Sequence, residues 1–183
     1  MRSLRRLLRI ALVLVMVCGT TGVGASPALA DTAGSGVNTA NDPVVVVLDT
    51  SSSMSDTDSA GTERIVGARA AVLGLVDALP PKSKFALIAY PGGGRVVDGC
   101  SVGRVEIPLG ELDQPTTAAA VRRLTPDGDT PTAPALQHAA DLIKRSPTQR
   151  GTIVLVSDGE SNCGSTDVCE LARKLATDGV EVR

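Results

Sequence analysis

Aromatic residues are almost absent from this sequence. Among its 183 residues there is no tryptophan, and Phe85 and Tyr90 are the only phenylalanine and tyrosine. Surfaces that bind nucleic acid combine clustered basic residues with stacking rings, so we expect no nucleic-acid partner. The core has to be built from Val, Leu, Ile and Ala, a composition that is typical of helices packed on a parallel sheet.

The first 30 residues have the layout of an export signal. Four arginines precede a short apolar run at 10–17, and in the segment Ala28-Leu29-Ala30 the two alanines provide the small residues expected before a cleavage point. The apolar run falls short of the ~20 residues of a membrane span, so we expect cleavage and a secreted, extracytoplasmic protein, with membrane contact only through an uncleaved signal. Paired arginines at 5–6 leave the general secretory and twin-arginine routes both open.

Removing this leader changes the charge balance. It carries four of the 18 basic residues and none of the 20 acidic ones, which leaves 14 basic residues and a net charge of −6. Residues 31–41 (DTAGSGVNTAN) are small and polar, and this composition predicts a flexible linker before the folded domain.

Histidine and cysteine are also scarce. His138 is the only histidine, and the cysteine spacing is not that of a zinc knuckle, so a zinc site is disfavoured. Three cysteines follow the leader: Cys100, Cys163 and Cys169. An oxidising compartment predicts one disulfide among them; Cys163 and Cys169 are closest in sequence, but all three pairings stay open.

Apolar runs alternate with helical periodicity from residue 42 to the end of the chain. We expect buried strands at 44–48, 85–90 and 152–157, another strand opening at 180, and an edge strand at 104–109 reached through a Gly-rich turn at 91–94. We expect helices at 62–79, 115–124, 131–144 and 167–177. This alternation predicts one α/β domain over 42–183, a doubly wound and mostly parallel sheet with helices on both faces. Ligands of such sheets bind beyond the carboxyl ends of the strands.

Oxygen-bearing side chains follow two of these strands and precede one helix. Asp49, Ser51 and Ser53 come directly after the strand at 44–48, Asp158 follows the strand at 152–157, and Thr130 precedes the helix at 131–144. We expect these five side chains to meet around one cation. Because every donor is an oxygen and only two are charged, Mg²⁺ is favoured, with Mn²⁺ or Ca²⁺ as alternatives, and the cation retains attraction for an outside anion.

Three segments carry a family resemblance. VVVVLDTSSSMS, GDTPTAPAL and TIVLVSDGES resemble, in that order, the metal-binding segments of von Willebrand factor type A domains, and the resemblance covers about residues 42–183. It implies a Rossmann-like fold and a metal-ion-dependent adhesion site, in which Ser51, Ser53 and Thr130 bind the cation. Asp49 and Asp158 would support it, partly through water, and an open position would accept an Asp or Glu of a protein partner.

The same resemblance implies a further strand and a final helix beyond Val180. We therefore expect a chain that stops at Arg183 to be a fragment, or to leave one edge of the sheet open.

Two other functions compete with a binding module. A haloacid dehalogenase-like phosphohydrolase would also place a nucleophilic aspartate after a strand, here Asp49, but it needs a second acid where Ser51 stands. A purely structural domain would use the metal only to tie its loops together. The residue pattern favours a module that is not an enzyme.

Overall fold

A five-stranded sheet forms the centre of the domain. The computed structural model describes residues 42–159 and 161–183, so the expected export signal (1–30), the expected linker (31–41) and Glu160 lie outside the described residues. The strand order is β5-β2-β1-β6-β7. The strands are β1 (Val44–Asp49), β2 (Lys84–Tyr90), β5 (Arg104–Glu111), β6 (Gly151–Val156) and β7 (Val180–Val182). β5 runs antiparallel to β2, and the other neighbours pair in parallel.

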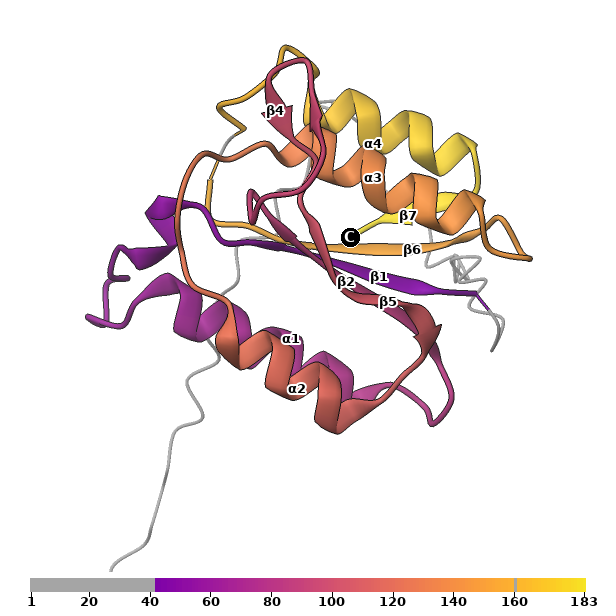
Figure 1. Cartoon of the computed structure of the whole chain (residues 1–183), viewed down its shortest axis with the longest axis horizontal. Coiled ribbons are helices and arrows are strands. Elements are labelled where there is room, and N and C mark those ends of the chain that lie inside the picture. Colours follow the sequence, from indigo (N-terminus) through magenta and orange to yellow (C-terminus); the bar gives the residue numbers. More distant parts are fainter. Residues whose placement is uncertain (1–41, 160) are drawn as a thin grey trace, which may run out of the picture. The chain divides into compact units, whose positions relative to one another are not determined.

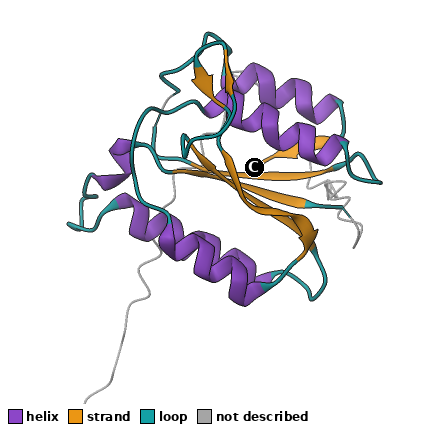
Figure 2. Ribbon diagram, viewed as in Figure 1, coloured by secondary structure: helices purple, strands orange, loops and turns teal. Residues whose placement is uncertain are grey.

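Helices cover both faces of this sheet, as Figures 1 and 2 show. They are α1 (Arg64–Ala78), α2 (Gln114–Arg123), α3 (Thr132–Lys144) and α4 (Val168–Thr177). α3 and α4 lie on one face, and α1 and α2 lie on the other (Figure 1). The predicted fold class, a mostly parallel α/β sheet between helices, is therefore confirmed.

β1 is the central strand, and its alternate side chains supply both cores. Val45 and Val47 belong to the apolar cluster beneath α3 and α4, whereas Val46 and Leu48 belong to the cluster beneath α1 and α2. All four side chains are fully buried. A strand with two covered faces has no polar position, which is why this segment is a continuous apolar run.

The starts of two helices can be compared with the starts that the sequence predicts. α4 begins where the sequence predicts a helix start, after Asp167, whose side chain caps the helix by accepting a 2.8 Å hydrogen bond from the Glu170 amide. The predicted start of the first helix at Thr62 is wrong, because α1 begins at Arg64. The Asp58 carboxylate accepts the Thr62 amide at 3.0 Å and so holds that residue in the preceding loop.

The segment between β2 and β5 contains a feature that the sequence did not predict. β3 (Val96–Val97) and β4 (Cys100–Ser101) form a separate two-stranded hairpin before β5 begins. Gly103 then returns the chain to the sheet with φ +76°, where an added Cβ would lie 2.8 Å from Ile88 Cγ2. Only glycine combines this backbone conformation with so close an approach.

β6 is less buried than its apolar sequence suggested. Ile153 is fully buried under α3 and α4, but Val154 and Val156 are only partly buried on the opposite face. On that face, α1 and α2 pack mainly against β1 and β2, so β6 lies at the margin of this apolar cluster. No helix in the described part of the chain is long and apolar enough to cross a membrane.

Candidate metal centre

Three chain segments meet at the carboxyl ends of β1 and β6 and at the start of α3. The turn after β1 and the loop before α3 are joined by backbone: the Ser52 amide donates to the Gly128 carbonyl at 3.0 Å, and the Asp127 amide donates to the Thr50 carbonyl at 2.7 Å. The loop after β6 joins them, because the Asn162 amide donates to the Thr130 carbonyl at 3.2 Å. We call Asp49, Ser51, Ser53, Thr130 and Asp158 the candidate metal centre.

Three of its side chains form a continuous row of oxygens. Ser51 Oγ lies 3.1 Å from Ser53 Oγ, which in turn donates to Asp158 Oδ1 at 3.0 Å. Ser51 is buried, whereas Ser53 is partly exposed and the Asp158 side chain is 9% exposed. The row therefore leads from the interior toward the surface, and an ion there would be reachable from solvent.

Asp49 lies behind this row and is fully buried. Its Oδ1 accepts the Ser51 amide at 2.8 Å, and its Oδ2 accepts hydrogen bonds from Ser157 Oγ at 2.6 Å and from Tyr90 Oη at 3.1 Å. Three donors hold this carboxylate in one orientation. The Asp49 carboxylate can therefore hold the turn after β1 in place and add negative charge behind the row of oxygens.

Tyr90 is the donor that comes from β2. Burial raises the pKa of its phenol, and the negative charge of Asp49 raises it further. The hydroxyl therefore stays protonated at neutral pH and remains a donor to Asp49. Tyr90 Oη also lies 3.3 Å from Thr132 Oγ1 in the first turn of α3.

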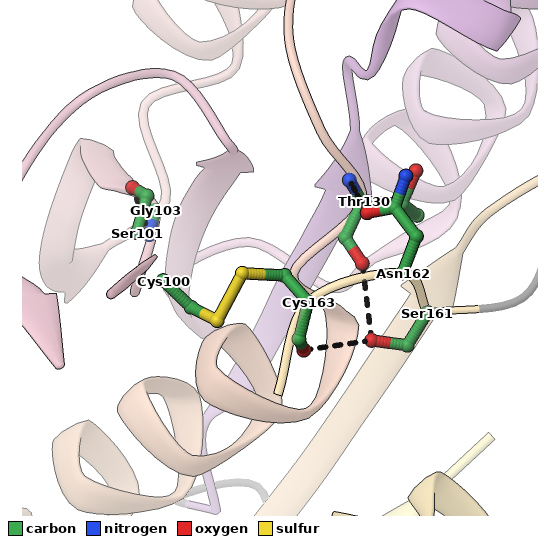
Figure 3. The surroundings of a disulfide bond; sticks show 7 residues. All are labelled: Cys100, Ser101, Gly103, Thr130, Ser161, Asn162 and Cys163. Carbon is green, nitrogen blue, oxygen red and sulfur yellow. Dashed lines mark hydrogen bonds between the residues drawn. A yellow bond between two sulfur atoms is a disulfide. The ribbon is translucent and has the colours of Figure 1, made fainter. Parts of the chain in front are cut away.

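Thr130 is held in place by its backbone. Its amide donates to Asn162 Oδ1 at 2.7 Å, and its carbonyl accepts from Ser161 Oγ at 3.0 Å; Figure 3 shows these three residues beside the disulfide bond. Among the described hydrogen bonds, none joins Thr130 Oγ1 to Ser53 or Asp158. The structure thus gathers four of the five predicted side chains in one network and brings the fifth to the same edge through its main chain.

A disulfide borders the centre. Of the three possible pairings, the structure forms Cys100 with Cys163, across 63 positions of sequence. The two cysteines closest in sequence, Cys163 and Cys169, are therefore not the bonded pair. Figure 3 shows the bond linking the β4 hairpin to the loop that follows Asp158, so it ties two segments that lie far apart in sequence.

Arg64, the first residue of α1, is a neighbour that the sequence analysis missed. Its Nη1 lies 2.6 Å from Asp158 Oδ2 and donates to the Ser53 carbonyl at 3.4 Å. The hydrogen bond with Asp158 and that group's charge raise the pKa of the guanidinium. The available signal was an arginine at the start of α1, the next long helix after the DxSxS turn.

Ser157 and Asn162 were missed as well. Both belong to the segment that follows β6, one position before and four positions after Asp158. Their closeness to Asp158 in sequence was the only indication of a role.

The donor chemistry fits a hard cation. Two carboxylates and two hydroxyls gather here, and oxygen donors of this kind suit Mg²⁺, Mn²⁺ or Ca²⁺. Within residues 42–159 and 161–183, no group of three or more His, Cys, Asp or Glu side chains is placed to hold a metal. Hydroxyl oxygens would consequently have to complete any coordination at this centre.

Comparisons with known proteins agree with this architecture. A family model described as the von Willebrand factor type A domain matches residues 44–160. Three solved structures share the fold. A von Willebrand factor type A protein from Catenulispora acidiphila has 22% sequence identity and a TM-score of 0.60, and the match covers 78% of this chain and 32% of that one. The vWF domain of the type V pili tip protein Mfa5 from Porphyromonas gingivalis has 24% identity and a TM-score of 0.52, with 67% and 39% covered. The PilB minor pilin from Streptococcus sanguinis has 21% identity and a TM-score of 0.52, with 67% and 31% covered.

This chain therefore spans between 31% and 39% of the length of those three structures. No curated protein matches it. The family model covers well over half of the chain and ends at the segment that carries Asp158. The chain belongs to the von Willebrand factor type A domain family.

Proposed function

We propose that this domain is an extracytoplasmic, non-catalytic binding module that holds one divalent cation, Mg²⁺ in the first instance, and captures a carboxylate of a protein partner. The observation that carries the proposal is the row of oxygens formed by Ser51, Ser53 and Asp158 at the carboxyl edge of the sheet. This edge is where α/β sheets place their ligands.

Each residue of the centre would have a distinct task. The hydroxyls of Ser51 and Ser53 and the carboxylate of Asp158 would hold the cation, and Thr130 would add a hydroxyl from the loop before α3. Asp49 would act from beneath, because its oxygens are taken by three donors. The bound cation supplies a Lewis-acidic position, and because the candidate metal centre itself contributes two carboxylates, part of the cation's charge stays available to an anion from outside.

The similar structures support an interaction role outside the cytoplasm. Two of the three structures named above are a pili tip protein and a minor pilin. The Cys100–Cys163 disulfide also fits an oxidising compartment, as does the export signal expected from the sequence.

The geometry lends no support to the phosphohydrolase alternative. A nucleophilic aspartate has to reach its substrate, but Asp49 is fully buried and both of its oxygens accept hydrogen bonds. Ser51 stands where the general acid would be needed. A phosphatase assay on an aryl phosphate should accordingly give no turnover that depends on Asp49.

Calorimetric titration with MgCl₂ tests the cation step. Wild type should bind one equivalent, and Ser53→Ala should weaken binding about tenfold or more, because a direct oxygen ligand is removed. Ser55→Ala is a matched control, since Ser55 is an exposed residue of the same turn. It should bind like wild type. Equal affinity in the two variants would contradict the assignment of Ser53.

A pair of peptides tests the carboxylate step. A glycine-flanked Glu peptide should bind the Mg²⁺-loaded domain more tightly than the same peptide with Gln, and EDTA should abolish the difference. Cation binding with no preference for Glu would indicate the structural alternative, in which the metal only ties the loops. Binding that persists in EDTA would discard the metal-dependent mechanism.

A further inference from the structure

The guanidinium of Arg64 forms an ion pair with Asp158, the carboxylate of the candidate metal centre that lies nearer the surface. Arg64 Nη1 lies 2.6 Å from Asp158 Oδ2, and the Asp158 side chain is only 9% exposed. Such a contact differs from an ordinary surface ion pair, in which both partners are well hydrated and gain little. Here one partner is shielded, although the Arg64 side chain itself is 39% exposed.

The contact also engages both loops of the centre. Ser53 Oγ donates to Asp158 Oδ1 while Arg64 takes Oδ2, so both carboxylate oxygens are in use. Arg64 Nη1 is in addition 3.4 Å from the Ser53 carbonyl. The other acid within ion-pair distance is Asp56, at 3.7 Å and on the solvent side with 68% of its side chain exposed. Arg64 is therefore directed mainly at Asp158.

The charges of the centre give this contact a consequence. Asp49 and Asp158 provide two negative charges, and Arg64 compensates one of them at contact distance. A dication that binds Asp158 loses part of the attraction of that carboxylate and is repelled by the guanidinium. We infer that Arg64 is a resident counter-cation of the centre, which competes with the divalent cation for Asp158 and so lowers the affinity of the centre for it.

This inference rests on the proposed function and adds a form of regulation to it. Before loading, Arg64 keeps the charge of the empty centre low and holds the turn after β1 to the loop after β6. After loading, its positive charge remains beside the cation and raises the attraction for an outside carboxylate.

The test compares Mg²⁺ binding by calorimetry in wild type, Arg64→Gln, Arg64→Lys and Arg145→Gln. Arg145→Gln makes the same change in net charge at the far end of α3 from the centre. We expect Arg64→Gln to bind Mg²⁺ roughly threefold to tenfold more tightly, a range reduced for the partial exposure of the pair. Arg64→Lys and Arg145→Gln should stay close to wild type.

Melting temperatures give a second readout that does not depend on measuring the affinity directly. Without Mg²⁺, Arg64→Gln should melt below wild type, because Asp158 loses its partner; with saturating Mg²⁺ its melting temperature should rise by more than that of wild type. Far-UV circular dichroism checks that the variant is folded.

The outcomes separate the two proposals. Mg²⁺ binding by wild type that is equal to or tighter than that of Arg64→Gln would overturn the competition while leaving the proposed function in place. Mg²⁺ binding by Arg64→Gln but not by wild type would support the competition, because Arg64 would then exclude the cation completely. Absence of Mg²⁺ binding in both proteins would overturn the cation site and the competition together.

Discussion

Tyr90 and Asp49 end neighbouring strands and are joined in the core by a 3.1 Å hydrogen bond from Oη to Oδ2. Both residues are fully buried. The phenol is thus part of the support of the candidate metal centre, although it lies too deep to be a surface ligand. Because it is the only tyrosine and there is no tryptophan, its spectrum reports on this one contact.

This contact predicts a loss of stability at alkaline pH. Burial and the charge of Asp49 raise the phenol pKa in the folded state, whereas the unfolded chain ionises near the ordinary value of about 10. The contribution is complete below that value and is lost as pH rises above it, since only the unfolded state then releases the proton. Urea unfolding at increasing pH should show a falling free energy, and tyrosinate absorbance should appear only with unfolding. Tyr90→Phe should remove most of this slope; an unchanged slope would contradict the assignment.

Substitution of Asp49 should be more damaging to the fold than substitution of Ser53. Asp49→Ala leaves the Ser51 amide and the hydroxyls of Tyr90 and Ser157 without their acceptor, so we expect a loss of about 3–5 kcal/mol. Ser53→Ala, on a partly exposed residue, should lose less than about 1 kcal/mol. Chemical denaturation without metal measures both. Equal losses would contradict the role of Asp49 as the acceptor of three buried donors. Because Asp49→Ala should also destabilise the fold, Ser53→Ala is the better variant for testing cation binding.

Much of this architecture could be predicted from the sequence because its signals are local. The continuous apolar run of β1 and the DxSxS turn after it specify a buried strand and a row of side chains at its end. The alternating residues of β5 specify an antiparallel edge strand, and the structure pairs it with β2.

The remaining contacts depend on how distant segments come together. Arg64 reaches Asp158 across 94 positions, and Cys100 reaches Cys163 across 63. Neither contact has a periodic pattern in the sequence, and the disulfide pairing depends on where the β3–β4 hairpin places Cys100 rather than on proximity along the chain. The sequence indicated which side chains gather at the candidate metal centre, but not the groups that hold or neutralise them.

Loss of the disulfide should lower stability. Cys100→Ser opens a loop of 63 positions, and the chain-entropy model gives a loss of about 4 kcal/mol in the free energy of unfolding. Urea unfolding of wild type in the presence of dithiothreitol should show a similar loss. Cys169→Ser retains the bond, so its stability should remain as sensitive to the reductant as that of wild type. Insensitivity of wild type to the reductant would contradict a stabilising role.

Two glycines should respond to alanine in opposite directions. A Cβ at Gly151 would lie 2.6 Å from the Pro43 carbonyl oxygen and 3.3 Å from Ile143 Cδ1, so Gly151→Ala should lose about 1–3 kcal/mol. Gly74 is an exposed residue inside α1 with open space at the same position. Gly74→Ala should gain about 0.5–1 kcal/mol through helix propensity. Thermal unfolding distinguishes them, and a stabilising Gly151→Ala would contradict the packing of β6 against Pro43.

The bond between Cys100 and Cys163 makes residues 100–163 a closed covalent ring, which contains β5, α2, α3 and β6 together with Thr130 and Asp158. A single proteolytic cut anywhere inside that ring leaves the chain in one piece. In a compartment rich in proteases, a nicked molecule would therefore keep the loops of α3 and β6 attached to the turn after β1, and would lose them only after a second cut or reduction.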